Sequence, residues 1–216
     1  HDAEIEKNMH KEHRGSFTYS YNCKPKPWEP FKDNKALNKK AYKLIKEFNI
    51  YYLPQSWSFS TDMYRTFSQM SLRNFNTADT GSEPMDLTFS KEFMWNRNFD
   101  IKYDFSKTLK FSLQTAMNSN IEEAYFTPEI GKEYYEAWRD TVMASLAKLG
   151  SPYTYQQVFT ASWNVPINKI PFLDWITANG SYNATYSWNR TADLQGGVSL
   201  GNVVSSMASW QVDGQL

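Results

Sequence analysis

The chain has little of what most catalytic and metal sites need. Its 216 residues include one cysteine and three histidines, and its 23 basic and 23 acidic side chains cancel. A single cysteine excludes a disulfide framework and a multi-cysteine metal site. Zero net charge argues against a basic nucleic-acid groove, so we expect no nucleic-acid partner. The sequence also lacks an apolar run of the roughly 18 residues that a transmembrane helix requires.

The few candidate catalytic or metal-ligating side chains lie in poor contexts for that chemistry. Cys23 has no base beside it in the sequence, and a cysteine nucleophile needs a positioned histidine. His10 and His13 have the spacing of two ligands on one helical face, but His1 is the only other histidine. We interpret these histidines as part of an exposed polar stretch that precedes the first strand. The sequence therefore predicts no enzyme activity, no metal site and no cofactor.

Aromatic side chains are abundant and regularly placed. They make up 17% of the chain, although its mean hydropathy is −0.65. The rings alternate with Ser, Thr and Asn, a pattern typical of strands with one apolar and one wet face. This pattern predicts an all-β fold, an antiparallel meander of long strands. Its seven segments are roughly 14–23, 55–69, 86–105, 109–119, 153–165, 174–190 and 203–215.

The alternation defines two sets of residues, which we call the apolar set and the polar set. The apolar set is Ile176, Ala178, Tyr182, Ala184, Tyr186, Trp188, Phe159, Trp163, Phe111 and Leu113. The polar set is Thr177, Asn179, Ser181, Asn183, Thr185, Asp100, Lys102 and Asp104. The charges of alternating sign at positions 100, 102 and 104 favour a wet sheet face over the paired carboxylates of a glycosidase.

The connectors between the segments are of two kinds. On one side of the meander 106–108 and 166–173 are short, whereas 70–85, 120–152 and 191–202 on the other side are long. This asymmetry, with strands longer than the roughly 9–11 residues that cross a bilayer, indicates an outer-membrane barrel. The long connector 24–54 on the short-turn side is the exception. We expect the apolar set to face lipid and the polar set to face a water-filled lumen.

Two connectors show helical rather than strand spacing. Apolar residues recur every three or four positions near 36–48, between lysines, and again near 129–149. Pro128 is placed for a helix start and Gly150 for a C-terminal cap of the second helix. The sequence therefore predicts short helical connectors at these two places.

One segment resembles a known family. The chain contains the decamer Pro166-Ile-Asn-Lys-Ile-Pro-Phe-Leu-Asp-Trp175, which is similar to a signature of the SprA/Sov proteins of Gram-negative Bacteroidota. Further similar blocks are spread from Arg14 to Leu216. They are Glu29-Pro-Phe31, Leu44-Ile-Lys-Glu-Phe-Asn49 before Leu53-Pro54, Ser58-Phe-Ser-Thr-Asp62 with Arg65, Gly201-Asn-Val-Val204 and Gln211-Val-Asp-Gly-Gln-Leu216.

The resemblance implies a location, a function and partners. Such proteins are outer-membrane translocons of type IX secretion, which also serve gliding motility, and each forms a very large single-chain β-barrel. The implied partners are outer-membrane lipid, a PorV-type shuttle protein, a plug protein, and secreted cargo with a C-terminal targeting domain. At 216 residues the chain covers only a fraction of such a barrel. We therefore expect residues 1–216 to be one segment, completed by the remainder of the barrel.

Two other classes of protein remain compatible with the pattern. A soluble or cell-surface β-sheet binding module would use the exposed rings to hold a ligand such as a glycan. A small self-contained outer-membrane barrel would need an eighth strand, for which 44–53 is the available segment, because closed bacterial barrels use even strand numbers.

Overall fold

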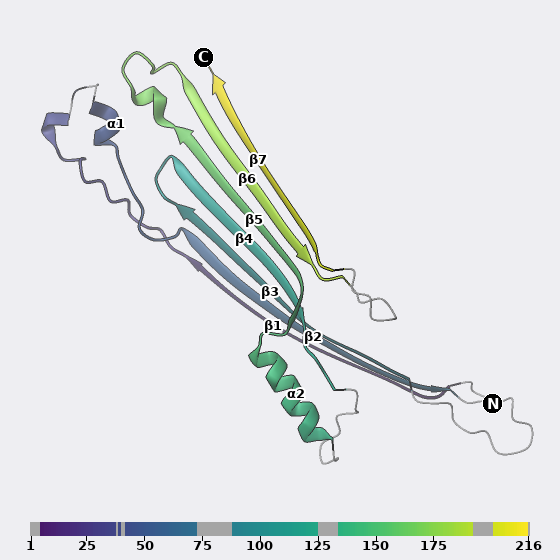
Figure 1. Cartoon of the computed structure of the whole chain (residues 1–216). Helices are drawn as coiled ribbons and strands as arrows, with labels where there is room; N and C mark the ends of the chain where they lie inside the picture. The colour runs from purple at the N-terminus through teal and green to yellow at the C-terminus, as the bar shows by residue number, and fades with distance from the viewer. Residues whose placement is uncertain are drawn as a thin grey trace, which may run out of the picture. The chain divides into compact units, whose positions relative to one another are not determined.

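The fold is one sheet of seven strands in the order of the sequence. The computed structural model describes residues 5–37, 39, 42–72, 88–124, 134–191 and 201–215. Neighbouring strands pair antiparallel from β1 to β7 (Figure 1). The predicted all-β antiparallel meander is therefore confirmed. The strands are β1 (Ile5–Asn22), β2 (Ser56–Leu72), β3 (Thr88–Asp104), β4 (Leu109–Asn120), β5 (Ser151–Val165), β6 (Thr177–Asn189) and β7 (Val203–Gln215).

In the part of the chain that the structure describes, four helical segments interrupt the meander between strands. They are η1 (Lys35–Leu37), α1 (Lys43–Lys46), α2 (Tyr135–Ala147) and η3 (Pro166–Lys169). None of the described helices combines the length and the apolar character needed to cross a membrane. The chain divides into two compact units, which we describe separately. The first unit is His1–Phe17, Thr61–Asn96 and Asn118–Tyr153, and the second is Thr18–Ser60, Arg97–Met117 and Thr154–Leu216.

The core of the first unit lies between the sheet and α2. Ile121 and Val142 are buried there, and Ser145 accepts a hydrogen bond at Oγ from the backbone N–H of Glu122 (3.1 Å). The helix ends as the sequence predicts, because the N–H of Gly150 donates to the carbonyl of Ser145 (2.8 Å). Gly150 has φ of 73°, and a Cβ there would lie 3.0 Å from Ile121, so only glycine fits this turn. The predicted helix residues 129–133 lie outside the described part of the chain.

The second unit has a connector docked on a tight turn. The segment 24–54 folds back on itself through the Trp28–Ile50 bridge and then follows the end of β3. Asn49, buried in this connector, accepts a hydrogen bond at Oδ1 from the N–H of Lys107 (2.7 Å). The hydroxyl of Tyr103 donates to the carbonyl of Tyr51 (2.6 Å). These bonds hold the connector against the β3–β4 turn.

Three boundaries differ from the sequence prediction. The first strand begins at Ile5 rather than near residue 14, because polar residues pair it with β2: His10 with Ser68 (2.7 Å) and Arg14 with Asp62 (2.9 Å). Residues 5–13 are mostly polar on both faces, so they show no clear period of two. His10 and His13 therefore lie within a strand, and the interpretation of a stretch before it was wrong for these two residues.

The predicted helical connector near 36–48 contains short helical segments. Among its described residues, Lys43–Lys46 form α1, and Leu44 and Ile45 in it stay exposed. A helix that buries no apolar face has little to stabilise it beyond one turn. The sixth strand also starts later than position 174. The N–H of Ile176 donates to the carbonyl of Leu173 (3.1 Å), which extends the preceding turn to the start of β6.

Candidate functional site

The strands β4 to β7 present one continuous apolar face. The register places Ala161 opposite Tyr182 and Tyr182 opposite Trp210. The rings of Phe111 and Phe159 stack with centroids 6.0 Å apart, and those of Phe159 and Tyr182 lie 6.2 Å apart. Cross-strand aromatic pairs of this kind stabilise a sheet and set its register. The face is therefore an ordered aromatic surface and not a scatter of single rings.

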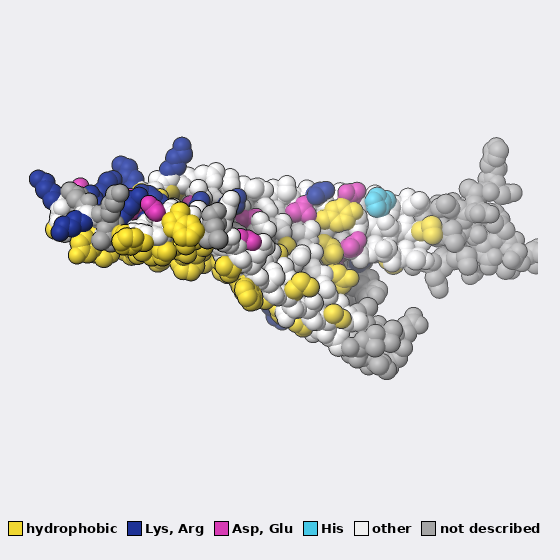
Figure 2. All heavy atoms as spheres, turned by 90° about the horizontal axis from the view of Figure 1, so that it is seen from above, with side chains coloured by type: hydrophobic (Ala, Val, Ile, Leu, Met, Phe, Trp, Pro, Cys, Tyr) yellow, Lys and Arg dark blue, Asp and Glu magenta, His cyan; other side chains and the backbone are white. Residues whose placement is uncertain are grey.

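This apolar face is exposed in the second unit. Trp210 is 77% exposed, and Trp163 and Tyr182 are exposed as well. At the left end of Figure 2 hydrophobic side chains line one edge, and Lys and Arg side chains gather opposite them. Exposed apolar patches of this extent are uncommon on soluble monomers and mark contact with another protein or with lipid.

The register brings almost all of the apolar set onto this face. Ala178, Tyr182, Ala184, Tyr186 and Trp188 of β6 share it with Phe159 and Trp163 of β5. The ring contact of Phe111 with Phe159 adds β4, and Leu113 lies two residues further along the same strand. Ile176 is the exception, because it lies in the turn before β6 and not in the strand.

The opposite face is polar and carries few charges in β5 to β7. Asn164, Asn179 and Asp213 lie in one row across these strands, and Thr160 and Asn183 belong to another. The polar-set residues of β6, at positions 177, 179, 181, 183 and 185, all lie on this face. Water solvates such a surface of hydroxyl and amide groups without strong fields of either sign.

Two hollows continue the polar face over β2 to β5. One of about 410 Å³ and one of about 430 Å³ are both lined by Asp100 and Gln114. Lys102 lines the first hollow, and Asp100 accepts a hydrogen bond from the hydroxyl of Ser58 (3.4 Å). Gln156 of β5 lines the second hollow and lies opposite Ser187 of β6. The hollows over β2 to β5 and the polar rows of β5 to β7 therefore lie on the same face of the sheet. Asp104 ends β3 two residues beyond Lys102.

A buried ion pair lies beneath α2 in the first unit. Arg65 of β2 donates from Nε to Oε1 of Glu123 (2.5 Å), and its guanidinium lies over the Trp138 ring, 5.2 Å from the centroid. The Glu123 side chain is only 4% exposed. Oε2 of Glu123, Nη2 of Arg65 and Nε1 of Trp138 are buried and find no hydrogen-bond partner among the described residues. A pair in this state is costly to break, because either charge left alone is desolvated.

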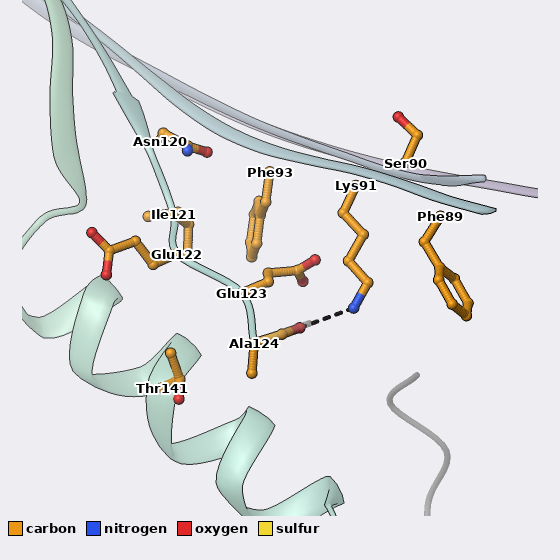
Figure 3. Close-up of a pocket in the computed structure, with 10 residues that line it drawn as sticks. All are labelled: Phe89, Ser90, Lys91, Phe93, Asn120, Ile121, Glu122, Glu123, Ala124 and Thr141. Carbon is orange, nitrogen blue, oxygen red and sulfur yellow. Dashed lines mark hydrogen bonds between the residues drawn. The ribbon is translucent and has the colours of Figure 1, made fainter. Parts of the chain in front are cut away.

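Beside this ion pair lies a cavity of about 580 Å³ (Figure 3). Phe93 and Lys91 of β3 form one wall, Glu122 and Glu123 another, and Thr141 of α2 closes it. Lys91 donates from Nζ to the carbonyl of Ala124 (2.9 Å), the bond that Figure 3 marks. No sequence pattern predicted this cavity. Its one signal is Arg65, a charge on the mainly apolar parity of the second strand.

Ion pairs attach the connector 24–54 to two turns of the second unit. Glu29 pairs with Lys107 (2.5 Å) and with Lys32 (2.8 Å), and Glu47 pairs with Lys169 (2.7 Å). The hydrogen bond from Lys107, followed by that from Lys32, lowers the pKa of Glu29 to about 2. The bond from Lys169 likewise lowers the pKa of Glu47. Both carboxylates therefore stay charged at any physiological pH.

The histidines and the cysteine do not come together. His10 and His13 lie three residues apart on β1, so their side chains point to opposite faces of the strand. His1 lies outside the described residues. Over 5–37, 39, 42–72, 88–124, 134–191 and 201–215, no three His, Cys, Asp or Glu side chains are grouped to hold a metal.

Comparison with known proteins leaves the chain without an assigned family. No model of a known protein family matches it, and no curated protein matches it either. The function must therefore be argued from the two faces of the sheet.

Proposed function

We propose that this chain is a segment of an outer-membrane, protein-conducting β-barrel of the SprA/Sov kind, which exports folded cargo by type IX secretion. The observation that carries the proposal is the two-faced sheet. Its aromatic face is exposed over β5 to β7, and its other face is polar and sparsely charged. A barrel wall between lipid and a water-filled lumen requires this division of side chains.

The edges of the sheet support a larger assembly. Within the described residues β1 and β7 each pair with one neighbour only, and every residue of β7 from Val203 to Gln215 is exposed. Backbone groups at an open edge have no partner in hydrocarbon, where each costs several kcal/mol, on the order of 2–7. A sheet of this kind needs further strands before it can sit in a bilayer. The remainder of the barrel is the partner that would supply them.

The polar face suits passage rather than catalysis. Its side chains over β5 to β7 are mainly Ser, Thr, Asn and Gln, with Asp213 as the acidic exception. Neutral hydroxyls and amides solvate a passing protein without binding it tightly, whereas rings or a strong charge field would retain it. On this proposal, function lies in lumen width and lining. The shuttle protein, the plug and the cargo with its C-terminal targeting domain act on the completed barrel.

Fractionation of the native source tests the proposal. An antibody against residues 134–150, which include α2, should detect a band in the outer membrane that is far larger than 25.2 kDa. Loss of the protein should leave cargo with a C-terminal targeting domain inside the cell. A soluble band near 25.2 kDa would contradict the proposal and favour a β-sheet binding module. A membrane band of that size would instead favour a small barrel, although 44–53 forms no strand beyond the Ile50 bridge.

A further inference from the structure

The neutral chain contains one strongly basic segment. The connector 24–54 carries eight lysines against three acidic residues, whereas basic and acidic residues of the whole chain are equal in number. The connector 24–54 thus has a net charge of about +5, and the rest of the sequence has an equal excess of acidic residues. Figure 2 shows Lys and Arg side chains gathered at the end of the second unit where this connector lies.

The docking of the connector leaves its lysines facing outward. Two of its three acidic residues, Glu29 and Glu47, pair with lysines, including Lys107 and Lys169 of the neighbouring turns. Asp33 is exposed. Five exposed lysines take part in none of the ion pairs of the described residues: Lys24, Lys26, Lys35, Lys39 and Lys43. We call these five the basic connector surface.

Bulky apolar side chains project beside this surface. Phe172, in the turn before β6, is 91% exposed and has a φ of 75°, a conformation that non-glycine residues rarely adopt. Trp175 of the same turn is 58% exposed, and its Nε1 donates to the carbonyl of Phe172 (3.0 Å). Tyr52 and Leu53 of the connector are exposed as well. The bond between Lys169 and Glu47 ties this turn to the connector.

Phe172 combines a strained backbone with an exposed ring, and this combination needs a reason outside the isolated chain. A left-handed residue is retained where its surroundings or its role require it, and nothing in the described part of the chain covers the Phe172 ring. Aromatic tips beside lysines are the combination that binds the headgroup level of a membrane. The rings insert at the boundary, and the ammonium groups attract anionic headgroups.

We propose that the basic connector surface and the tips at 172 and 175 bind anionic phospholipid headgroups at the short-turn side of the membrane. This inference rests on the proposed barrel, which puts the short turns at one membrane surface. The charge of the connector selects the occupant. Five uncompensated lysines favour phosphatidylglycerol or another anionic lipid over the neutral phosphatidylcholine, and the attraction weakens as salt is added.

Vesicle flotation of the full chain tests the proposal. One set of vesicles is phosphatidylcholine alone, and the other is an equimolar mixture with phosphatidylglycerol. We expect at least tenfold tighter binding to the mixture at low salt, and a ratio close to one at about 1 M salt. Binding to phosphatidylcholine itself reports the aromatic sheet face, and so the proposed barrel. The ratio between the two vesicles reports only the connector, so the two proposals can fail separately.

Matched variants locate the effect. A variant with four exposed lysines changed to Gln, Lys24→Gln with Lys26→Gln, Lys35→Gln and Lys43→Gln, should bring the ratio down to about one. A variant with the same loss of charge elsewhere should keep the ratio: Lys11→Gln with Arg139→Gln, Lys148→Gln and Arg190→Gln. Phe172→Asn, which tolerates the same backbone conformation, should weaken binding to both vesicles.

Three results would overturn the inference. The first is equal binding to the two kinds of vesicle at low salt. The second is a ratio that falls as much in the control variant as in the connector variant. The third is selective capture of an acidic protein by the basic connector surface with no preference between the lipids, since that would make the connector a protein-binding site.

Discussion

Each unit has a sheet face that carries aromatic rings, and the two units use this face differently. In the first unit it is covered, because α2 lies over Arg65 and the strand residues around it. In the second unit it is exposed, with Trp210 and Trp163 accessible over β5 to β7. The covered part contains a buried ion pair and a cavity, whereas the exposed part contains rings and small apolar residues.

The difference shows where charge is tolerated. In the first unit this face carries Arg65 of β2 and Lys91 of β3, and in the second unit it carries the part-buried Arg97 of β3. The apolar side of β5 carries none from Tyr153 to Val165. Protein can supply a counterion and hydrogen bonds to a charge, but hydrocarbon supplies neither. The charge-free side of β5 therefore belongs to the part that we propose to meet lipid.

The largest effect should come from breaking the buried ion pair. Arg65→Met leaves the desolvated Glu123 carboxylate without its ion-pair partner, with the Lys91 ammonium still nearby, and costs up to about 3–5 kcal/mol. Hydrogen exchange of the α2 amides in the assembled protein measures this as faster local opening. The double variant Arg65→Met with Glu123→Met removes both charges and should recover most of the protection, because a hydrophobic replacement of both partners is often neutral. Equal loss in the single and double variants would mean that packing, not charge, holds α2.

A charge on the exposed apolar face should have the next largest effect. Ala184→Lys places an ammonium among Phe159, Tyr182 and Ala208, and costs about 2–4 kcal/mol if this face meets the bilayer midplane. Asn183→Lys puts the same charge one residue away on the polar face, and we expect normal assembly. The measurement is the amount of each variant in the outer membrane. Equal tolerance of the two lysines would remove the assignment of faces to lipid and lumen.

The sequence predicted the fold wherever one face is apolar and the other polar. The period of two in 153–165 and 174–190 predicts the bounds of β5 and β6 within three residues. A strand with one apolar face and one solvated face must alternate apolar and polar side chains along its length. It failed at residues 5–13, where both faces are polar and side-chain pairing with β2 decides the conformation.

The cavity beneath α2 could not be predicted from the sequence for a different reason. Arg65 and Glu123 are 58 positions apart, and nothing local connects them. Only the meander brings these residues together. The charge of Arg65 on a mainly apolar parity indicates that protein covers this position. The sequence does not indicate which carboxylate pairs with Arg65.

A substitution of Phe172, in the turn before β6, tests whether the ring of this residue is covered or exposed in the assembled protein. Phe172→Gly relieves a left-handed backbone that costs about 1–2 kcal/mol, so the turn should become more stable by about that amount. If a protein layer covered the ring, as α2 covers Arg65, its loss would instead cost about 3–5 kcal/mol. Hydrogen exchange of residues 167–176 gives the sign. Phe172→Ala, which keeps the strain and loses the ring, is the control and should not stabilise the turn.

The smallest effect should come from acid at the connector, where the ion pairs are more exposed than the one beneath α2. Lys107 and Lys32 lower the pKa of Glu29 from 4.5 to about 2, so the charged carboxylate stabilises the docked connector. That contribution is complete above about 4.5 and is lost as the pH falls through about 2. Hydrogen exchange of residues 24–54 should therefore become faster as the pH falls from about 4.5 to about 2. The exchange of the α2 amides does not depend on Glu29 and should not follow the same pH profile. In Lys107→Gln the pKa of Glu29 rises towards its ordinary value, and the loss should begin at higher pH. An unchanged acid profile in this variant would show that Asn49 and the backbone bonds, rather than Glu29, hold the connector.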